Sequence, residues 1–286
     1  MAHIFGVATL ASLGIATVIF DFTRTPYRNV PRPSEKQRLK IFDLSAENYD
    51  SDQSFHEWIT RIRTHRKTVF SKARGRVLEI GAGTGRNLDV LKCTPGVTSL
   101  TCIDTSGPMC EVLVKKLEKL KPPFPVQVIQ GDASQVPFED NTFDSVISSF
   151  ALCAVERPEQ TVEETRRVLK GGGRFLLLER GLPSSNFARW ILKRYEIYPN
   201  PNVACEIGIF EDIDLGQLLA QGKFRLTESA PSKVMTVHAL SARRGCSAEE
   251  RKSHARSRVG LPELRGQTDA RVVFRYTPNS DDATQK

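Results

Sequence analysis

The stretch that most constrains this 286-residue chain is Val77–Asn87, which reads VLEIGAGTGRN. Its apolar start predicts a buried strand, and three glycines then crowd a turn before a helical run that we expect to begin at Asn87. Glycine permits the unusual φ and ψ angles of such a turn, and a ligand can approach the backbone where no Cβ intervenes. The following helix points its free N–H groups at the loop. The stretch therefore predicts a site for a nucleotide-like ligand.

The spacing of the glycines separates two kinds of nucleotide site. A dinucleotide fingerprint, G-x-G-x-x-G, would need glycine at position 86, where this chain has Arg86. Instead Gly81, Gly83 and Gly85 are spaced as G-x-G-x-G, and Glu79 comes just before them. This spacing departs from the NAD-binding pattern.

The segments that follow predict further strands of one sheet. Residues 99–103 form an apolar run that ends at Asp104, about one βαβ unit after the glycines. An acidic residue there can accept hydrogen bonds from both hydroxyls of a ribose, although a helix N-cap explains it equally well. Later runs predict the remaining strands: 126–130, 143–149, 174–179 and, as a closing antiparallel hairpin, 224–228 and 234–240. The order predicts an α/β fold with a mostly parallel sheet and helices on both faces.

Taken together, these motifs resemble the class I S-adenosylmethionine-dependent methyltransferases. Residues 161–170 predict a helix that runs into a glycine turn at 171–173, and VLKGGGRFLLLE resembles the family's leucine-x-proline-glycine-glycine turn and strand, with Gly171 in place of proline. The resemblance implies a Rossmann-like, seven-stranded sheet, S-adenosylmethionine as cofactor, and contact of Asp132 with the adenine amino group. The cofactor site that it implies comprises Glu79, Gly81, Ala82, Gly83, Gly85, Asn87, Asp104, Thr105, Asp132, Ala133, Ser149 and Tyr49.

The region before the glycines narrows the resemblance. The run IFDLSAENYDSDQSFHEWITRIRTHRKTVFSKARGRVLEIGAGTGRN is similar to the start of ubiquinone-biosynthesis (UbiE)-like methyltransferases. It most closely resembles the fungal mitochondrial inner-membrane OMS group, and next the membrane-anchored methyltransferase-like thiol methyltransferases. The resemblance spans residues 40–242 and says little about the methyl acceptor. It implies that Tyr49 covers the methyl-donor pocket, although a packing aromatic at a helix end is an equal alternative.

An apolar segment at the N-terminus predicts a membrane anchor over residues 1–22. Residues 4–20 carry no charge, and seventeen residues make about 26 Å of helix, slightly under the ~30 Å hydrocarbon core. No Lys or Arg precedes this run, and six basic residues follow between positions 24 and 40, which is typical of a stop-transfer flank. A cleaved signal peptide is the alternative. Residues 23–34 then predict a basic, proline-containing spacer that favours anionic headgroups.

The remaining chain divides into a methyltransferase domain over 35–242 and a basic tail over 243–286 that we expect to be mostly disordered. Within the tail, residues 271–276 (RVVFRY) predict a short strand or a docking segment. Helices are expected over 35–50 and 54–73. The second is amphipathic, with a basic face that is either solvated or in contact with a membrane surface.

The chemistry of methyl transfer sets modest demands on side chains. Displacement at a sulfonium needs alignment of donor and acceptor, and only a poorly ionised acceptor needs a base. The candidate bases are His56, His65, Glu179 and His238, and none is singled out as catalytic. The rim over the methyl group is expected at 150–158, and the aromatic-rich insertion at 182–211 is expected to form the acceptor pocket. The six cysteines have neither C-x-x-C pairs nor zinc spacing, so no metal is expected.

Three functions fit these features. The first is a membrane-anchored methyltransferase acting on a small, lipophilic acceptor such as a quinone precursor, lipid or thiol. The second is a protein or RNA methyltransferase, which the basic tail favours, although no RNA-binding module accompanies it and a nucleic-acid partner is not expected. The third is a catalytically weak scaffold in a membrane assembly. A mitochondrial membrane is favoured, with the endoplasmic reticulum or a lipid droplet as alternative, and the sequence does not indicate an oligomeric state.

Overall fold

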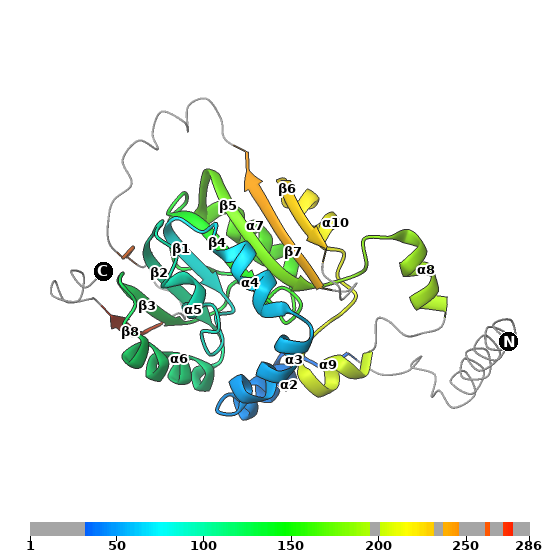
Figure 1. The fold of residues 1–286 in the computed structure, drawn as a ribbon, viewed down its shortest axis with the longest axis horizontal. Coiled ribbons are helices and arrows are strands. Elements are labelled where there is room, and N and C mark those ends of the chain that lie inside the picture. Colours follow the sequence, from blue (N-terminus) through cyan, green and yellow to red (C-terminus); the bar gives the residue numbers. More distant parts are fainter. Residues whose placement is uncertain (1–31, 195–200, 232–236, 246–260, 264–270, 277–286) are drawn as a thin grey trace, which may run out of the picture.

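A computed structural model describes residues 32–194, 201–231, 237–245, 261–263 and 271–276. Its centre is an eight-stranded sheet with the strand order β6-β7-β5-β4-β1-β2-β3-β8 (Figure 1). The strands are β1 (Gly75–Ile80), β2 (Val97–Asp104), β3 (Val126–Gln130), β4 (Phe143–Ser149), β5 (Leu169–Arg180), β6 (Phe224–Pro231), β7 (Val237–Arg244) and β8 (Arg271–Tyr276). The predicted mostly parallel α/β architecture is confirmed.

The direction of the strands locates the ligand-binding edge. Strands β1 to β5 are parallel, whereas β7 runs antiparallel to both β5 and β6, and β8 runs antiparallel to β3. The chain order reverses between β1 and β4, which lie side by side. In open α/β sheets, ligands bind beyond the carboxyl ends of the strands at such a switch point.

Helices cover both faces of the sheet. They are α2 (Glu35–Ser45), α3 (Tyr49–Ile59), α4 (Ile62–Phe70), α5 (Leu88–Leu91), α6 (Gly107–Leu120), α7 (Pro158–Val168), α8 (Asn186–Arg194), α9 (Pro201–Ile207) and α10 (Leu215–Gln221). Apolar residues of α4, α5 and α6 pack on one face, and those of α7 and α10 pack on the other. Helices α2, α3 and α9 gather beyond the carboxyl ends of the parallel strands (Figure 1).

The sheet has one strand more than the seven that were predicted. Strand β8 pairs with the edge strand β3 in the register Val126↔Tyr276, so part of the expected disordered tail is ordered. Phe274 and Tyr276 pack on the core of one face, whereas Val272, beyond a register shift in the pairing with β3, packs on the core of the other. Partial burial of these side chains and pairing with β3 hold the strand there. The strand alternative for residues 271–276 is therefore confirmed.

The N-terminal part of the predicted domain is divided differently from the expectation. Three helices, α2 to α4, replace the predicted pair over 35–50 and 54–73. The break between α3 and α4 is at Arg61, whose φ of 58° is left-handed and turns the chain. Beyond this turn, Ile62, Val69 and Phe70 dock on the sheet. The short α5 begins one residue later than the helix predicted from Asn87.

The glycine triplet was predicted to form a turn, and this is wrong. Residues 171–173 lie within β5, where the pairing with β4 jumps from Phe143↔Leu169 to Ser145↔Arg174. The strand thus accommodates the glycines as a bulge. The predicted anchor over 1–22 lies outside the described residues, as does most of the spacer. Among the described residues, no helix combines the length and the apolarity needed to cross a bilayer.

Candidate active site

A single pocket beyond the carboxyl ends of the strands collects the residues predicted for the cofactor site. All of them line it except Gly85. Gly85 has a φ of +75°, and a Cβ there would overlap the Leu113 side chain, so this glycine allows the loop to pack against α6. Gly83 differs, because a Cβ there would point into open space. The loop is therefore closely packed at Gly85 and open to a ligand at Gly83.

Asp104 is held at the end of β2 by backbone donors. Its Oδ2 accepts a hydrogen bond from the Gly83 N–H at 2.7 Å, and its Oδ1 accepts one from the Ser106 N–H at 2.9 Å. Burial raises the pKa of Asp104, and these two hydrogen bonds partly offset that effect. Each carboxylate oxygen keeps a free lone pair for a further donor. Ser106, not Asp104, is the N-cap of α6.

Glu79 supports the glycine loop from beneath. It is fully buried, and its Oε1 accepts a hydrogen bond from Asn87 Nδ2 at 2.6 Å. Burial is the main reason that the pKa of Glu79 rises to about 7. Asn87 Oδ1 in turn accepts a hydrogen bond from Arg66, which also donates to Ser149 Oγ at 2.7 Å. Arg66 thus joins the glycine loop to the end of β4.

Helix α3 is fastened over the glycine loop by charged groups. Glu57 pairs with both Arg66 and Arg86, and Asp50 pairs with Arg86 and Lys116. These contacts place Tyr49, the first residue of α3, in the pocket lining, and burial raises the pKa of its phenol. The network was missed in the sequence because Arg66 was assigned to a basic face that could be solvated, whereas only 4% of it is exposed.

The segments that were predicted to contact the adenine and the acceptor also meet in the pocket lining. Asp132 Oδ1 accepts a hydrogen bond from the Ser134 N–H at 2.7 Å, and Ala133 lies beside it in the lining. The loop after β4 forms the expected rim and starts at Phe150, whose left-handed φ of 57° is unusual for an aromatic residue. From the insertion, Ile207 and Ile209 reach the pocket. Trp190 does not line it, and residues 195–200 lie outside the description.

Comparison with known proteins decides the family. Residues 78–177 match the family described as Methyltransferase domain. The ubiquinone/menaquinone biosynthesis C-methyltransferase UbiE of Pseudomonas aeruginosa is 31% identical over 183 residues, which cover 62% of this chain and 70% of that protein. This chain belongs to the UbiE-type methyltransferases. S-adenosylmethionine is accordingly the cofactor of this methyltransferase, and the third predicted function, a catalytically weak scaffold, is not supported.

Two further relatives define how far the likeness extends. The mitochondrial methyltransferase OMS1 of Saccharomyces cerevisiae is 27% identical over 225 residues, which cover 73% of this methyltransferase but 46% of OMS1. A crystal structure of an S-adenosylmethionine-dependent methyltransferase of Thermotoga maritima matches with a TM-score of 0.51 and 20% identity, covering 72% of this chain and 99% of that one. At that identity the structural match shows the fold alone. This chain spans about half the length of OMS1.

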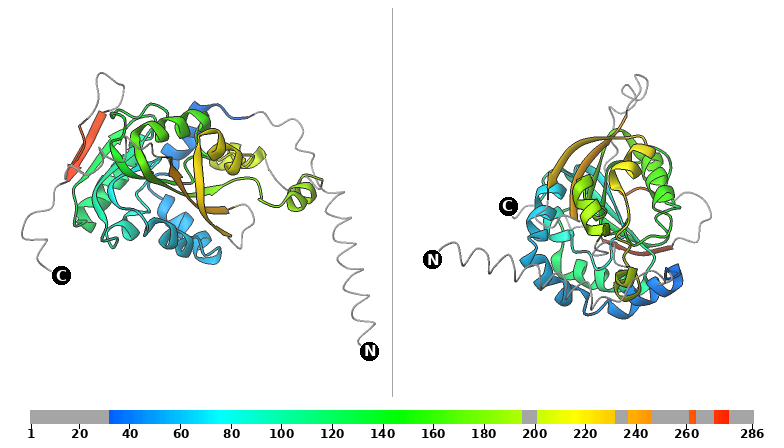
Figure 2. Two further views of the ribbon diagram at one scale, coloured as in Figure 1. Left: turned by 90° about the horizontal axis from the view of Figure 1, so that it is seen from above. Right: turned by 90° about the vertical axis from the view of Figure 1, so that its right-hand side faces the viewer.

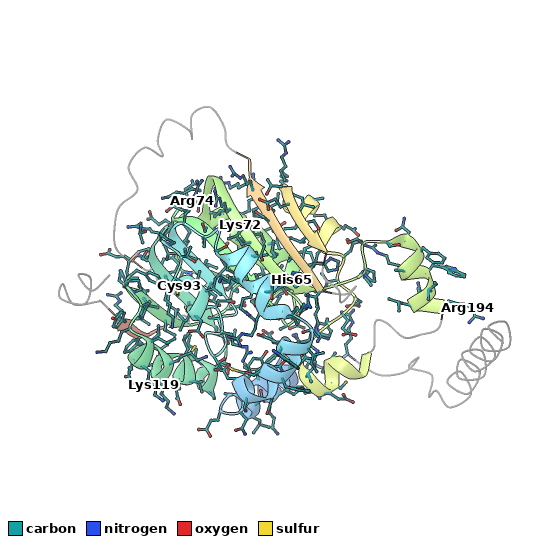
Figure 3. All side chains as sticks on the ribbon, in the orientation of Figure 1. His65, Lys72, Arg74, Cys93, Lys119 and Arg194 are labelled. Atoms are coloured by element: carbon teal, nitrogen blue, oxygen red, sulfur yellow. The ribbon has the colours of Figure 1, made fainter. Side chains whose placement is uncertain are left out.

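The candidate bases of the methyltransferase are not equally placed. His56 lines the pocket rim, whereas His65, on α4 (Figure 3), and His238, on β7, do not line the pocket. Glu179 is fully buried and accepts hydrogen bonds from Ser148 Oγ and from the backbone N–H groups of residues 151–153. Glu179 therefore shapes the rim and is not oriented as a base toward the pocket.

The described residues include no cluster of side chains that could hold a metal ion. Of the six cysteines, Cys102, Cys110 and Cys153 are buried, and Cys93 and Cys205 are exposed. Burial, reinforced by nearby Glu79, raises the pKa of Cys102 well above its usual value. The buried cysteines consequently act as small apolar residues of the core.

Proposed function

We propose that this chain is a membrane-anchored methyltransferase that transfers the methyl group of S-adenosylmethionine to a small, lipophilic acceptor. The observation that carries the proposal is the presence of apolar side chains in the pocket lining. Beside the polar glycine loop, the lining includes Phe42 of α2, Phe150 and Val155 of the rim, and Ile207 and Ile209 of the insertion, among charged residues of the same segments. A pocket that combines polar groups with apolar side chains suits a charged donor next to an apolar acceptor.

For the donor, we assign roles to the polar groups of the pocket. The two oxygens of Asp104 would accept hydrogen bonds from the ribose hydroxyls, and Asp132 would face the adenine. The open space at Gly83 leaves the backbone accessible, since nothing lies within 4 Å of a Cβ built there. S-adenosylmethionine supplies a methyl group on a positively charged sulfur when bound. The protein's contribution is to hold that group and the acceptor in line, which supplies several kcal/mol of the rate enhancement, on the order of 7–11 in the best cases.

For the acceptor, we assign to His56, which lines the pocket, the role of proton acceptor. Its pKa is lowered, first because the ring is partly desolvated at the pocket rim and second because the charge of Arg180 is near. At neutral pH the imidazole is therefore neutral and can accept a proton from a hydroxyl, a thiol or an activated carbon. Such a base would be needed for a quinone precursor or a thiol that is poorly ionised.

The membrane location rests on the sequence and on the relatives. The apolar run at residues 4–20 is long enough to begin a membrane span, and basic residues follow it. The OMS1 relative is named as mitochondrial, and the UbiE relative is named for ubiquinone and menaquinone biosynthesis, whose products are lipid-soluble. Both names favour an acceptor of the membrane, and a mitochondrial membrane is the compartment that we propose.

The first test is calorimetric titration of S-adenosylmethionine into the full chain in detergent micelles. Because Asp104 carries two loop contacts and the proposed ribose contacts, Asp104→Ala should weaken binding about 100-fold, which corresponds to about 2.7 kcal/mol. Asp89→Ala is the matched control, since this aspartate has a side chain that is 72% exposed on the neighbouring α5. Equal affinity of all three proteins would contradict the assigned donor site.

The acceptor class is tested with labelled S-adenosylmethionine. Purified lipid extract, total RNA and total protein are offered in parallel to the full chain in lipid nanodiscs. Label in the lipid fraction that depends on Asp104 is the expected result. Label confined to RNA or protein would replace the lipophilic acceptor by the second function.

A further inference from the structure

Two helices that are far apart in the sequence present the same exposed aromatic pair. Phe55 and Trp58 of α3 are 68% and 69% exposed, and Phe187 and Trp190 of α8 are 69% and 62% exposed. Within each pair the rings are stacked with their centroids 6.3 Å apart. Both pairs have the spacing Phe-x-x-Trp, which puts the two rings on one side of a helix. Surface aromatics that are grouped in this way mark an interaction surface.

Each aromatic pair is followed by basic residues about one turn later. Trp58 is followed by Arg61 and Arg63, and Trp190 by Lys193 and Arg194, and all four cations are exposed. Figure 3 shows Arg194 at the outer end of α8, away from the sheet. Aromatic rings next to Lys and Arg are the arrangement of helices that lie in a membrane interface, where the rings enter the headgroup region and the cations meet anionic lipids.

The two helices belong to the end of the molecule that holds the pocket. The opposite side of α3 lines the pocket through Gln53 and His56. Helix α8 has no buried residue and is held to the domain by Arg189, which donates to Asp214 at 2.7 Å. In Figures 1 and 2, α8 projects at the end of the molecule opposite to β8. Ile207 of α9 is both 42% exposed and part of the pocket lining, so the pocket reaches the surface at this end.

The start of the described chain lies at the same end. Arg32 pairs with Asp212, just after α9, and its guanidinium carbon lies 4.8 Å above the centre of the Phe210 ring. Nine residues, 23–31, separate Arg32 from the proposed anchor, and even a fully extended stretch of this length spans at most about 32 Å. An anchor at residues 1–22 would therefore hold this end of the domain, and not the end with β8, near the bilayer.

We propose that α3 and α8, through the pairs Phe55–Trp58 and Phe187–Trp190 and the basic residues after them, form a docking face for an anionic lipid bilayer. Helix α3 also lines the pocket through Gln53 and His56, so docking would bring the pocket close to the membrane in which a lipophilic acceptor dissolves. This inference rests on two parts of the proposed function, the lipophilic acceptor and the membrane anchor at residues 1–22. A protein partner or a second copy of the chain would cover the same rings, and the test separates these occupants.

The test uses the tryptophans themselves, because Trp58 and Trp190 are the only two in the sequence. The full chain is reconstituted in vesicles of phosphatidylcholine and phosphatidylglycerol, with and without bromine on the acyl chains. Trp58→Phe and Trp190→Phe isolate one reporter each. Docked rings lie within about 10 Å of the headgroup boundary, so brominated lipid should reduce each emission about twofold or more. Acrylamide in the aqueous phase should quench both reporters weakly.

Controls separate docking from mere tethering. In the triple variant Trp58→Phe, Trp190→Phe and Val273→Trp, the reporter is moved to β8, where Val273 is 41% exposed at the opposite end. It should respond to acrylamide and not to brominated lipid. Vesicles without phosphatidylglycerol should weaken the lipid quenching of Trp58 and Trp190. Phe55→Ser and Phe187→Ser together should weaken it as well, while leaving the reporters in place.

Several outcomes would overturn the docking face. Quenching of Trp58 and Trp190 by acrylamide alone would mean that both rings face water, and protection from both quenchers would mean that protein covers them. Resistance of the vesicle-bound chain to alkaline carbonate extraction tests the anchor separately, and S-adenosylmethionine titration tests the enzyme. If brominated lipid quenches the tryptophans of a chain that carbonate extracts and that does not bind S-adenosylmethionine, the docking face is supported and the proposed function is wrong. If the chain resists extraction and binds S-adenosylmethionine but brominated lipid does not quench the tryptophans, the function is supported and the docking face is wrong.

Discussion

The floor and the cover of the pocket are built in opposite ways. The floor, Gly81–Asn87 with Asp104, consists of backbone and short side chains at the ends of β1 and β2, and its key hydrogen bonds involve backbone N–H groups. The cover, helices α2 to α4, is fastened to the floor by ion pairs between long side chains, such as those of Glu57 and Arg86. The floor therefore depends on local geometry, whereas the cover depends on charges being matched across the fold.

Because of this difference, different substitutions are expected to destabilise the floor and the cover. A floor built from backbone tolerates most side-chain changes. The exceptions are a glycine replaced by a residue with a Cβ and the removal of the Asp104 carboxylate. A cover of buried ions is sensitive to the loss of one partner, because the remaining charge is left in a desolvated place. The cover also contributes Tyr49, Gln53 and His56 to the pocket, so its fit to the floor determines how the pocket closes.

The largest expected effect is on the cover, at Arg66. Its side chain is 5% exposed and pairs with Glu57, whose side chain is 6% exposed. Arg66→Met removes one partner of a buried pair, and it should lower the free energy of unfolding by about 3–5 kcal/mol. Urea denaturation of the full chain in detergent measures this change. S-adenosylmethionine affinity should fall too, because Asn87 and Ser149 lose their common donor.

Two further variants sharpen the interpretation of Arg66. Arg63→Met changes an exposed arginine of the same helix and should cost little, within about 0.5 kcal/mol. In Arg66→Met the buried Glu57 carboxylate keeps Arg86 as its ionic partner but loses Arg66, so adding Glu57→Gln should recover part of the lost stability. If both variants lower the free energy of unfolding by the same amount, the buried ion pairs do not stabilise the cover in the way proposed.

The second expected effect is on the floor and depends on pH. The pKa of Glu79 is about 7 in the folded chain and about 4.3 for an unfolded glutamate, so the folded state retains a proton that the unfolded state releases. Stability should therefore fall as the pH rises from about 4.5 to 7, and the total contribution of this group is about 4 kcal/mol. Nearby Arg66 and Lys116 favour the charged form, and Asp104 opposes it.

Glu79→Gln removes this titration while keeping an oxygen that can accept from Asn87. The difference in unfolding free energy between the wild-type chain and the variant should therefore change across that pH window and level off above it. Urea denaturation at several pH values measures the difference. Glu118→Gln, on the exposed side of α6, is the matched control. A constant difference for Glu79→Gln would show that burial does not hold the proton on this group.

The contrast between floor and cover also explains what the sequence could predict. The floor follows from a local pattern, and strands β3 and β4 occupy the predicted ranges, because apolar runs and glycine spacing act over a few residues. The three helices of the cover were not separated, since their break depends on a left-handed Arg61 and on docking against a distant sheet. The bulge in β5 could not be predicted from the sequence either, because it is defined by the register in which β5 pairs with β4.

Individual side chains show the same limit. Glu179 ends a strand, as a base of the site would, yet its partners are the backbone of residues 151–153, which lie 26 to 28 positions away. Arg66 is one of several arginines on an amphipathic helix, and no local signal marks it as the buried one. The roles proposed for Asp104 and Asp132 stay predictions until a ligand is bound, although the structure brings both into one pocket.

The smallest expected effect is at Asp50, the outer fastening of the cover. Its Oδ1 accepts hydrogen bonds from Thr84 Oγ1 at 2.7 Å and from Arg86 at 3.0 Å, and Lys116 pairs with Oδ2. Burial alone would raise the pKa of Asp50, but the bonds from Lys116 and Thr84 outweigh it, and the net pKa is lowered. Because the side chain is 37% exposed, Asp50→Asn should cost about 1 kcal/mol or less.

The sign of this effect with pH is opposite to that at Glu79. A lowered carboxyl pKa stabilises the folded chain above the unfolded value of about 3.9, and that contribution is lost as the pH falls through the folded pKa. Wild type and Asp50→Asn should therefore differ at neutral pH and converge in acid. Asp52→Asn, exposed on the same turn, is the matched control. Stopped-flow dissociation should also show S-adenosylmethionine leaving the Asp50 variant a few-fold faster, with its association rate nearly unchanged. An unchanged dissociation rate would mean that α3 does not retain the donor, and that the floor alone holds it.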